Sequence, residues 1–264
     1  MRNISEKKRV VIKLGTSTLA HKTGKLNIRR MTNLVRVISD LHNSGREIIM
    51  VSSGAVGLGA GKIGLPEKPK QTNIKQAVAA IGQCELMHVY DDMFAKYSVT
   101  VAQILLTKAI IDNSNHCQNF KTAVETLIGM GVIPIVNEND TIAIDELELE
   151  IGENDSLSAL VAELSGADLL LILSDIDGLY TDDPRTNPDA EPIHVVEKIT
   201  PEIESVAGGA GSSLGTGGMS TKINAAKIAT EAGIDMVIMN GKDPEKLYDL
   251  FEDKEIGTIF KASR

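Results

Sequence analysis

The chain has 264 residues, of which 42% are hydrophobic and 24% are charged, as in an ordinary globular protein that can bury a full core. The formal net charge is −9, and only 3% of the residues are aromatic. These values argue against a nucleic-acid partner, because a phosphate backbone needs a basic surface and single strands need aromatic stacking platforms.

Cysteine content and hydropathy bear on where the protein acts. Cys84 and Cys117 show no close-spaced metal pattern, and we interpret them as reduced thiols of a cytoplasmic protein. The longest apolar run, Leu169–Leu173, is too short to cross a membrane. We therefore expect neither a membrane segment nor a disulfide framework.

Short apolar runs alternate with helical patterns along the chain. We expect strands at "RVVIKLG", "REIIMVSSG", "VTVAQILLT", "VIPIVNEND", "DLLLILS" and "DMVIMN". Helices are predicted from Asn27 to Gly45, around residues 120–131, from Ser156, and over "STKINAAKIATEAG". In "IAIDELELEIG" the apolar residues mostly alternate, which predicts an exposed hairpin.

Repeated strand–helix–strand units predict an α/β fold with a mostly parallel sheet covered on both faces. We expect one domain with two lobes that join near residues 165–170. Polar or glycine-rich segments follow several of the strands: "KLGTST", "SSGAVGLG", "NEND" and "SDIDGLY". Ligands of such sheets bind at the carboxyl ends of the strands, so these segments are the candidate site.

Lys13 stands inside the first apolar strand, next to its end. A buried lysine is costly unless it is paired, so one interpretation is that its side chain snorkels to the surface. The other is that Lys13 and Gly15 hold a transferring phosphoryl group, since glycine admits close approach and the hydroxyls of Thr16 and Ser17 add donors.

The second glycine-rich segment, "VSSGAVGLGAGKIG", contains a formal G-x-G-x-x-G at Gly59, Gly61 and Gly64. A dinucleotide fingerprint must open a helix, but Leu65-Pro66 follows at once, so a nicotinamide site is disfavoured. Ser53 and Gly54, at the strand end, are the better candidates. The alternative for Ser53 is a plain helix cap.

The segments "VNENDTI" and "IGENDSLSAL" each carry Glu-Asn-Asp. Either can be an ordinary turn, because Asn and Asp tolerate turn geometry. Together they can surround one small polar ligand, with Asp140 pairing with an amine and Asn137 and Asn154 binding a carboxylate. Asp155 can instead hold two lysines in position for catalysis.

The segment "GTGGMSTK" is predicted to lie just before or inside the start of a helix. Helix N-termini bind anions, and Lys222, about one turn into the helix, can reach a transferring group. The alternative is a flexible surface loop with a solvated lysine. Lysines and backbone donors without a general base fit phosphoryl transfer, in which positioning and charge stabilisation dominate.

Taken in order, six segments resemble the amino acid kinase family. They are "VVIKLGTSTL", "IIMVSSGAVGLG", "VIPIVNENDTI", "GENDSLSALVA", "LLLILSDIDGLYTDDPRTNP" and "GTGGMSTKINAAKIATEAGID". The resemblance implies a three-layer αβα sandwich with an open, mostly parallel sheet of about eight strands. It also implies transfer of the ATP γ-phosphoryl group to the side-chain carboxylate of L-glutamate, giving L-glutamyl 5-phosphate in the first step of proline biosynthesis.

The same resemblance implies roles for individual residues. Catalysis is expected from Lys13, Lys222 and Asp155. Substrate binding is expected from Ser53, Gly54, Asn137, Asp140 and Asn154. ATP binding is expected from Lys13, Gly15, Ser174, Asp175, Thr216, Gly217, Gly218, Met219, Ser220, Thr221 and Lys222. Mg²⁺ is expected on the ATP phosphates. Ser174 and Glu153 depart from the threonine and aspartate that are common in the family.

Domain organisation and partners are also implied. We expect a single kinase domain over 1–264, with a substrate-binding lobe (1–165), a nucleotide-binding lobe (166–264) and no C-terminal PUA domain. Proline is expected as a feedback inhibitor acting at residues 137–155. A homo-oligomer, either dimer or tetramer, is expected, and glutamate-5-semialdehyde dehydrogenase is the expected functional partner that takes over the acyl phosphate.

The sequence disfavours two other functions. A kinase of the same fold acting on acetylglutamate, aspartate, carbamate or a nucleotide is disfavoured by the loops "NENDTI" and "GENDSLSA". A catalytically silent amino-acid sensor is disfavoured because both lysines and Asp155 are present.

Overall fold

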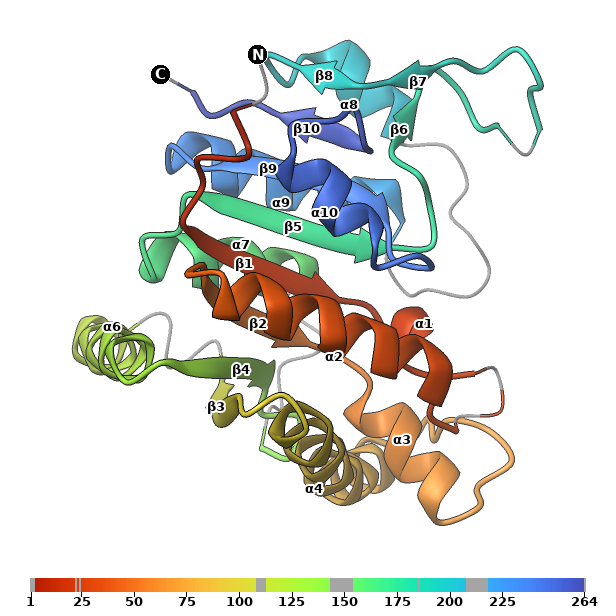
Figure 1. The fold of residues 1–264 in the computed structure, drawn as a ribbon. Helices are drawn as coiled ribbons and strands as arrows, with labels where there is room; N and C mark the ends of the chain where they lie inside the picture. Colours follow the sequence, from red (N-terminus) through yellow and green to blue (C-terminus); the bar gives the residue numbers. More distant parts are fainter. Residues whose placement is uncertain are drawn as a thin grey trace.

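The computed structural model describes residues 3–21, 23, 25–107, 113–142, 154–184, 186–207 and 218–263. Within these residues, an eight-stranded sheet has the order β3-β4-β2-β1-β5-β9-β10-β8 (Figure 1). Its strands are β1 (Arg9–Leu14), β2 (Glu47–Ser52), β3 (Thr100–Leu106), β4 (Val132–Glu138), β5 (Leu169–Ser174), β8 (Val195–Val196), β9 (Asp235–Asn240) and β10 (Thr258–Phe260). Every neighbouring pair is parallel except β9 and β10. The predicted α/β class and mostly parallel sheet are confirmed.

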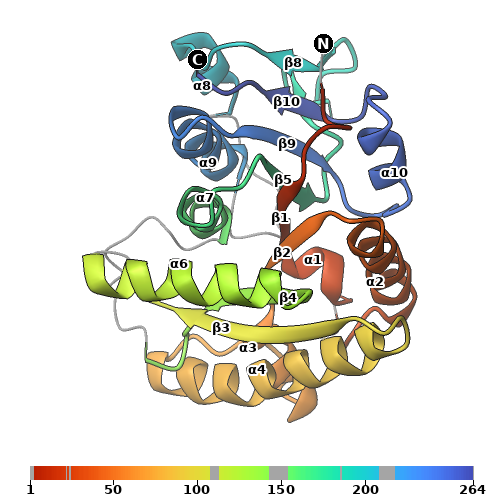
Figure 2. The same cartoon turned by 60° about the vertical axis from the view of Figure 1, so that its left-hand side comes forward.

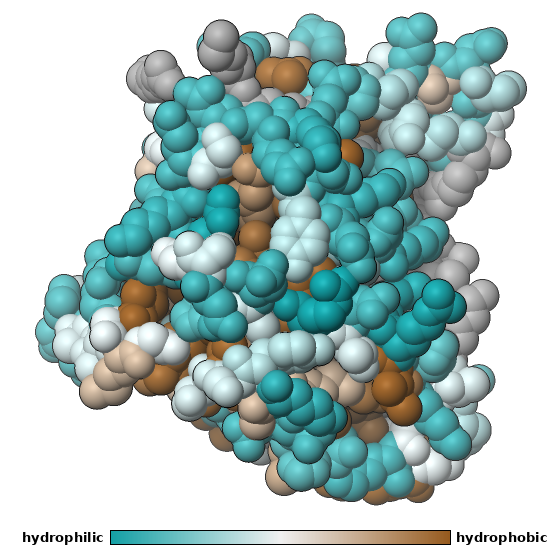
Figure 3. Space-filling model, viewed as in Figure 1, coloured by the Kyte–Doolittle hydropathy of each residue, from teal (hydrophilic) through white to brown (hydrophobic). Residues whose placement is uncertain are grey.

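Helices cover both faces of this sheet, which makes three layers (Figure 2). The described helices are α1 (Thr16–Leu19), α2 (Ile28–Asn43), α3 (Ala55–Lys62), α4 (Thr72–Ala95), α6 (Ser114–Gly129), α7 (Asn154–Leu164), α8 (Pro201–Ala207), α9 (Met219–Glu231) and α10 (Lys246–Phe251). A separate antiparallel pair joins β6 (Leu179–Tyr180) and β7 (Pro192–Ile193). Figure 3 shows that the outer surface on the α2 side is mostly hydrophilic.

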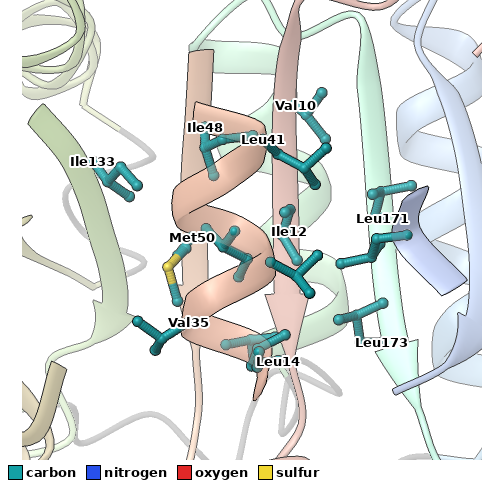
Figure 4. Packing of buried hydrophobic residues seen from close by; sticks show 14 of the residues in the cluster. Val10, Ile12, Leu14, Val35, Leu41, Ile48, Met50, Ile133, Leu171 and Leu173 are labelled. Atoms are coloured by element: carbon teal, nitrogen blue, oxygen red, sulfur yellow. The ribbon is translucent and has the colours of Figure 1, made fainter. Parts of the chain in front are cut away.

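The sheet divides the core into two hydrophobic clusters. One cluster lies under α2, α4 and α10 and includes Val10, Ile12 and Leu14 of β1. Figure 4 shows Val35 of α2 close to this face of the sheet. The other cluster lies under α6, α7 and α9 and includes Val11. Successive side chains of a strand point to opposite faces, so Lys13 lies on the same face as Val11, beneath α7.

The ends of α2 follow their predicted signals. The side chain of Asn27 accepts a hydrogen bond from the backbone N–H of Arg30 at 3.2 Å, which caps the helix N-terminus. Gly45, just beyond the last turn, has φ = 102°, a left-handed conformation that glycine adopts without strain.

Among the glycines of the formal G-x-G-x-x-G, Gly59 has a packing function. Gly59 and Gly61 lie inside α3, so the segment does not form a loop that opens a helix. A Cβ atom on Gly59 would lie 2.0 Å from the carbonyl oxygen of Val78, and one on Gly82 would lie 1.7 Å from that of Ala55. The backbones of α3 and α4 therefore touch at this crossing, and no side chain fits between them.

The hairpin and the absence of a membrane segment were also expected from the sequence. The hairpin expected in "IAIDELELEIG" lies outside the described residues, except for Ile142. No helix in the described part of the chain is long and apolar enough to cross a membrane.

Candidate active site

The candidate site lies where the order of the strands reverses. β1 is paired with β2 on one side and with β5 on the other, and both pairs are parallel. The chain passes from β1 to β2, β3 and β4 on one side before β5 returns to the other side of β1. Such a switch point leaves a crevice outside the carboxyl ends of the strands, which is where ligands of open α/β sheets bind.

A buried ionic centre lies at this point. Asp155, in the first turn of α7, has no exposed surface, and Lys13 and Lys222 are only 6% and 5% exposed. The Nζ of Lys13 lies 2.6 Å from Asp155 Oδ1, and the Nζ of Lys222 lies 3.2 Å from Oδ2. Lys13 therefore does not snorkel to the surface, because it pairs with the buried carboxylate of Asp155.

The electrostatics of this centre favour an anion. Burial alone would raise the pKa of Asp155, but the charges of Lys13 and Lys222 outweigh it, and hydrogen bonds from Lys13 and Thr221 add to them. The pKa of Asp155 is therefore held below its ordinary value, and the carboxylate is charged at neutral pH. Two ammonium groups and one carboxylate leave a net charge of about +1, which is suited to a phosphoryl group.

The N-terminus of α9 forms part of the same centre. Gly218 precedes the helix without a side-chain cap, and Lys222 is the fourth residue of the helix, in agreement with the prediction of about one turn. The hydroxyl of Thr221 lies 3.0 Å from Asp155 Oδ2. Met219 and Ser220 begin the first turn, and the N–H groups at a helix N-terminus favour anions. Thr216 and Gly217 lie outside the described residues.

On the other side of the centre, amide side chains form a network between β2, β4 and α7. Asn154 Nδ2 lies 2.9 Å from both Ser53 Oγ and Asn137 Oδ1. It also donates to the backbone carbonyl of Ser52. Asn137, at the end of β4, is 2% exposed, and its Nδ2 donates to Gln83 Oε1 at 2.8 Å. The structure thus brings together Ser53, Asn137 and Asn154, which the sequence predicts to be substrate-binding residues.

The loops around this network hold the remaining predicted substrate residues. Gly54 has φ = 102° and is the residue that precedes α3, so the interpretation of Ser53 as the helix cap is wrong. The Ser53 hydroxyl instead contacts Asn154, because Gly54 can take the left-handed conformation required at the helix start. Asp140 lies in the turn that follows β4.

The predicted nucleotide residues lie at the ends of β1 and β5. Ser174 ends β5, and its hydroxyl lies 3.2 Å from Asp175 Oδ1. The backbone carbonyl of Ser174 accepts a hydrogen bond from Gly241 N–H at 2.8 Å, which ties this corner to the end of β9. Gly15 follows β1 and precedes α1.

The described residues contain one further contributor that the sequence analysis did not identify. Gln83 of α4 completes the amide network, but a lone glutamine on a helix carries no sequence signal of its own. Among these described side chains, no group of three or more His, Cys, Asp or Glu residues is placed to hold a metal ion.

The fold and the site define an enzyme that handles phosphoryl groups at the switch point of a parallel sheet. The family model described as "Amino acid kinase family" matches residues 8–240, and the chain belongs to that family.

Particular relatives are closely similar over almost the whole chain. The chain is 52% identical over 263 residues to a protein of Clostridium perfringens named "Glutamate 5-kinase", covering 99% of this chain and 98% of the relative. It is 51% identical to the "Glutamate 5-kinase" of Moorella thermoacetica over 97% of this chain and 68% of that longer relative. Among solved structures, the UMP kinase of Bacillus anthracis has a TM-score of 0.67 at 15% identity, with 98% of this chain and 97% of that chain covered. At this identity the last similarity shows the fold alone.

Proposed function

We propose that the chain catalyses the glutamate 5-kinase reaction, the transfer of the ATP γ-phosphoryl group to the side-chain carboxylate of L-glutamate. The observation that carries this proposal is the buried Lys13–Asp155–Lys222 centre, placed between the amide network and the end of β5. The relatives with about half of their residues identical support the choice of acceptor.

The chemistry requires little of the protein beyond positioning and charge. A glutamate side chain has a pKa near 4.3, so at neutral pH its carboxylate is already an ionised nucleophile and needs no general base. One carboxylate oxygen attacks the γ-phosphorus, the bond to the bridging β,γ-oxygen breaks, and ADP leaves with that electron pair. Lys13 and Lys222 would stabilise the charge on the transferring group, with Asp155 holding both ammonium groups in place.

The two substrates would approach the centre from opposite sides of β1. In this proposal the lobe formed by residues 1–165 binds glutamate through Ser53, Gly54, Asn137, Asp140 and Asn154. The lobe formed by residues 166–264 binds ATP through the end of β5 and the start of α9, with Gly15 and Lys13 contributing from β1. Mg²⁺ would enter with the ATP phosphates, since this ion is usually held by substrate phosphates, waters and few carboxylates.

We also infer the setting of the reaction from the family. The product is a labile acyl phosphate, and we propose that glutamate-5-semialdehyde dehydrogenase consumes it on the route to proline. Feedback inhibition by proline through residues 137–155, a cytoplasmic location and a homo-oligomeric state belong to the same proposal. Cys84 and Cys117 form no disulfide, which is compatible with a reducing compartment.

Product trapping tests this function directly. The protein is mixed with Mg-ATP, hydroxylamine and one acceptor at a time, and hydroxamate and ADP are measured. Glutamate should yield γ-glutamyl hydroxamate, whereas acetylglutamate and aspartate should not. Phosphorylation of one of those acceptors instead would replace the proposed substrate. ATP binding without any product would favour an amino-acid sensor.

A further inference from the structure

We propose that Gln83, on α4, is a positioning residue of the acceptor site, which acts by fixing the amide of Asn137 and, through it, that of Asn154. This inference deepens the proposed function and rests on it. Gln83 belongs to none of the loops that carry the other site residues. Its Oε1 accepts a hydrogen bond from Asn137 Nδ2 at 2.8 Å, which links it to the site.

The orientation of each side-chain amide in this network follows from one group that can only accept a hydrogen bond. The backbone carbonyl of Ser52 can only accept, so the group that Asn154 presents to it must be Nδ2. The same Nδ2 lies 2.9 Å from Asn137, which must therefore present its Oδ1. Asn137 then turns its own Nδ2 towards Gln83, and Gln83 must accept through Oε1. Each amide in the chain has one orientation that satisfies its neighbour.

Gln83 is therefore the last member of a series of hydrogen-bonded amides that determines which atom of Asn154 is available to a ligand. Asn154 Nδ2 has only two hydrogens, and three protein oxygens surround it. Its donors are thus committed to the protein, and the group left for an amino-acid acceptor is the oxygen Oδ1. This oxygen suits the ammonium group of the acceptor rather than the carboxylate that the sequence analysis assigned to Asn154. Without an acceptor at position 83, Asn137 would lose the partner that keeps its Oδ1 facing Asn154.

The position of Gln83 is fixed by the helix crossing described above. It follows Gly82, where α4 lies backbone to backbone on α3, and α3 begins at the Ser53–Gly54 corner. Further along α4, the hydroxyl of Tyr90 lies 2.9 Å from Ser52 Oγ, and both groups are buried. The helix thus contacts this corner of the site at two points about two turns apart.

The other end of the Gln83 side chain carries a cost in local stability. Its Nε2 is buried and has no hydrogen-bond partner among the residues described. A buried donor without a partner is unfavourable, and a methionine of similar shape would avoid that cost. The benefit of an amide here therefore lies in the bond that it accepts from Asn137.

The test compares Gln83→Met with the wild-type chain in steady-state kinetics. We expect the KM for glutamate to rise about 5- to 30-fold, the scale of one lost hydrogen bond to a buried amide. The KM for ATP should stay within about twofold, and the melting temperature within about 3 °C. Gln118→Met, on the exposed surface of α6, is the matched control and should change none of the three.

A double-mutant cycle separates positioning from a general structural role. If Gln83 acts through Asn137, adding Gln83→Met to an Asn137→Ala chain should change the KM for glutamate by less than about twofold. Independent, multiplicative effects would overturn the inference, as would an unchanged KM for glutamate or equal rises for both substrates in Gln83→Met. An inactive wild-type chain would instead refute the proposed function, and the inference would fall with it.

Discussion

Replacing Lys222 by alanine would remove one of the two cations of the ionic centre. The net charge of the centre would fall from about +1 to about 0, because Lys13 and Asp155 would remain as a balanced pair at 2.6 Å. We expect the turnover number to fall about 10²- to 10³-fold, the range measured when one transition-state contact is removed.

The size of this effect agrees with a simple electrostatic calculation. A unit charge about 4 Å from the developing negative charge contributes about 4 kcal/mol at an effective dielectric constant of about 20. A 10²- to 10³-fold loss of rate corresponds to about 2.7–4 kcal/mol. We expect the free energy of unfolding to fall by about 1–3 kcal/mol. This loss is no larger than the loss in transition-state stabilisation, because Asp155 keeps its ion pair with Lys13.

The assay is γ-glutamyl hydroxamate formation at saturating glutamate and Mg-ATP, with thermal melting as the check on folding. Lys227→Ala is the matched control, because Lys227 lies on the same helix but pairs with Glu204 at the surface. The control should turn over normally, and the KM for glutamate should change little in Lys222→Ala. A folded Lys222→Ala chain with near-normal turnover would refute the assignment of α9 to the phosphoryl site.

The remaining predictions concern stability and substrate binding. The pKa of Asp155 is lowered on folding, so its carboxylate stabilises the protein above the unfolded pKa near 3.9, and this contribution is lost as the pH falls through the lower, folded value. Urea unfolding of Asp155→Asn should therefore show a weaker acid dependence, and identical curves for both chains would contradict this. Gly82→Ala should lose about 1–3 kcal/mol of unfolding free energy, since its Cβ would lie 1.7 Å from the Ala55 carbonyl, whereas Gly129→Ala, with open space around it, should lose none. Asp140→Ala should weaken glutamate binding far more than ATP binding in equilibrium titrations, and equal losses would count against its place in the acceptor site.

Several elements could be predicted from the sequence because buried elements consist largely of apolar residues. β1, β2, β4, β5 and β9 lie between layers of helices, so they consist of near-continuous apolar runs. The helix α2 has a clear apolar face, and Gly45 lies just beyond its end. These signals are local, and the structure confirms them.

The helix α4 is absent from the elements predicted above, although the sequence carries a signal for it. Its buried residues recur at every fourth position, from Val78 through Gly82, Leu86 and Tyr90 to Phe94. Small residues surround the start of this series (Ala77, Ala79, Ala80 and Gly82), and small residues resemble a loop when glycine-rich sequence precedes them. Their real function is to let α4 approach α3, which depends on a partner helix that no local pattern reveals.

The candidate site was predictable only in part, for the same reason. The strand pattern places Lys13 at a strand end, and the resemblance pairs it with Asp155 and Lys222. Neither shows that all three are buried together, because that follows from the packing of α7 and α9 on the sheet. The partner of Asn137 could not be found either, since Gln83 lies 54 positions away along the chain.

The first turn of α7 places two neighbouring residues in different parts of the site. Asn154 belongs to the amide network, whereas Asp155 holds the two lysines. A ligand that shifts this turn by binding near Asn154 must also displace Asp155, and a ligand near Asp155 must displace Asn154. Under the proposed assignment, the affinities for acceptor and nucleotide are thermodynamically linked. If one substrate changes the affinity for the other by some factor, the second must change the affinity for the first by the same factor.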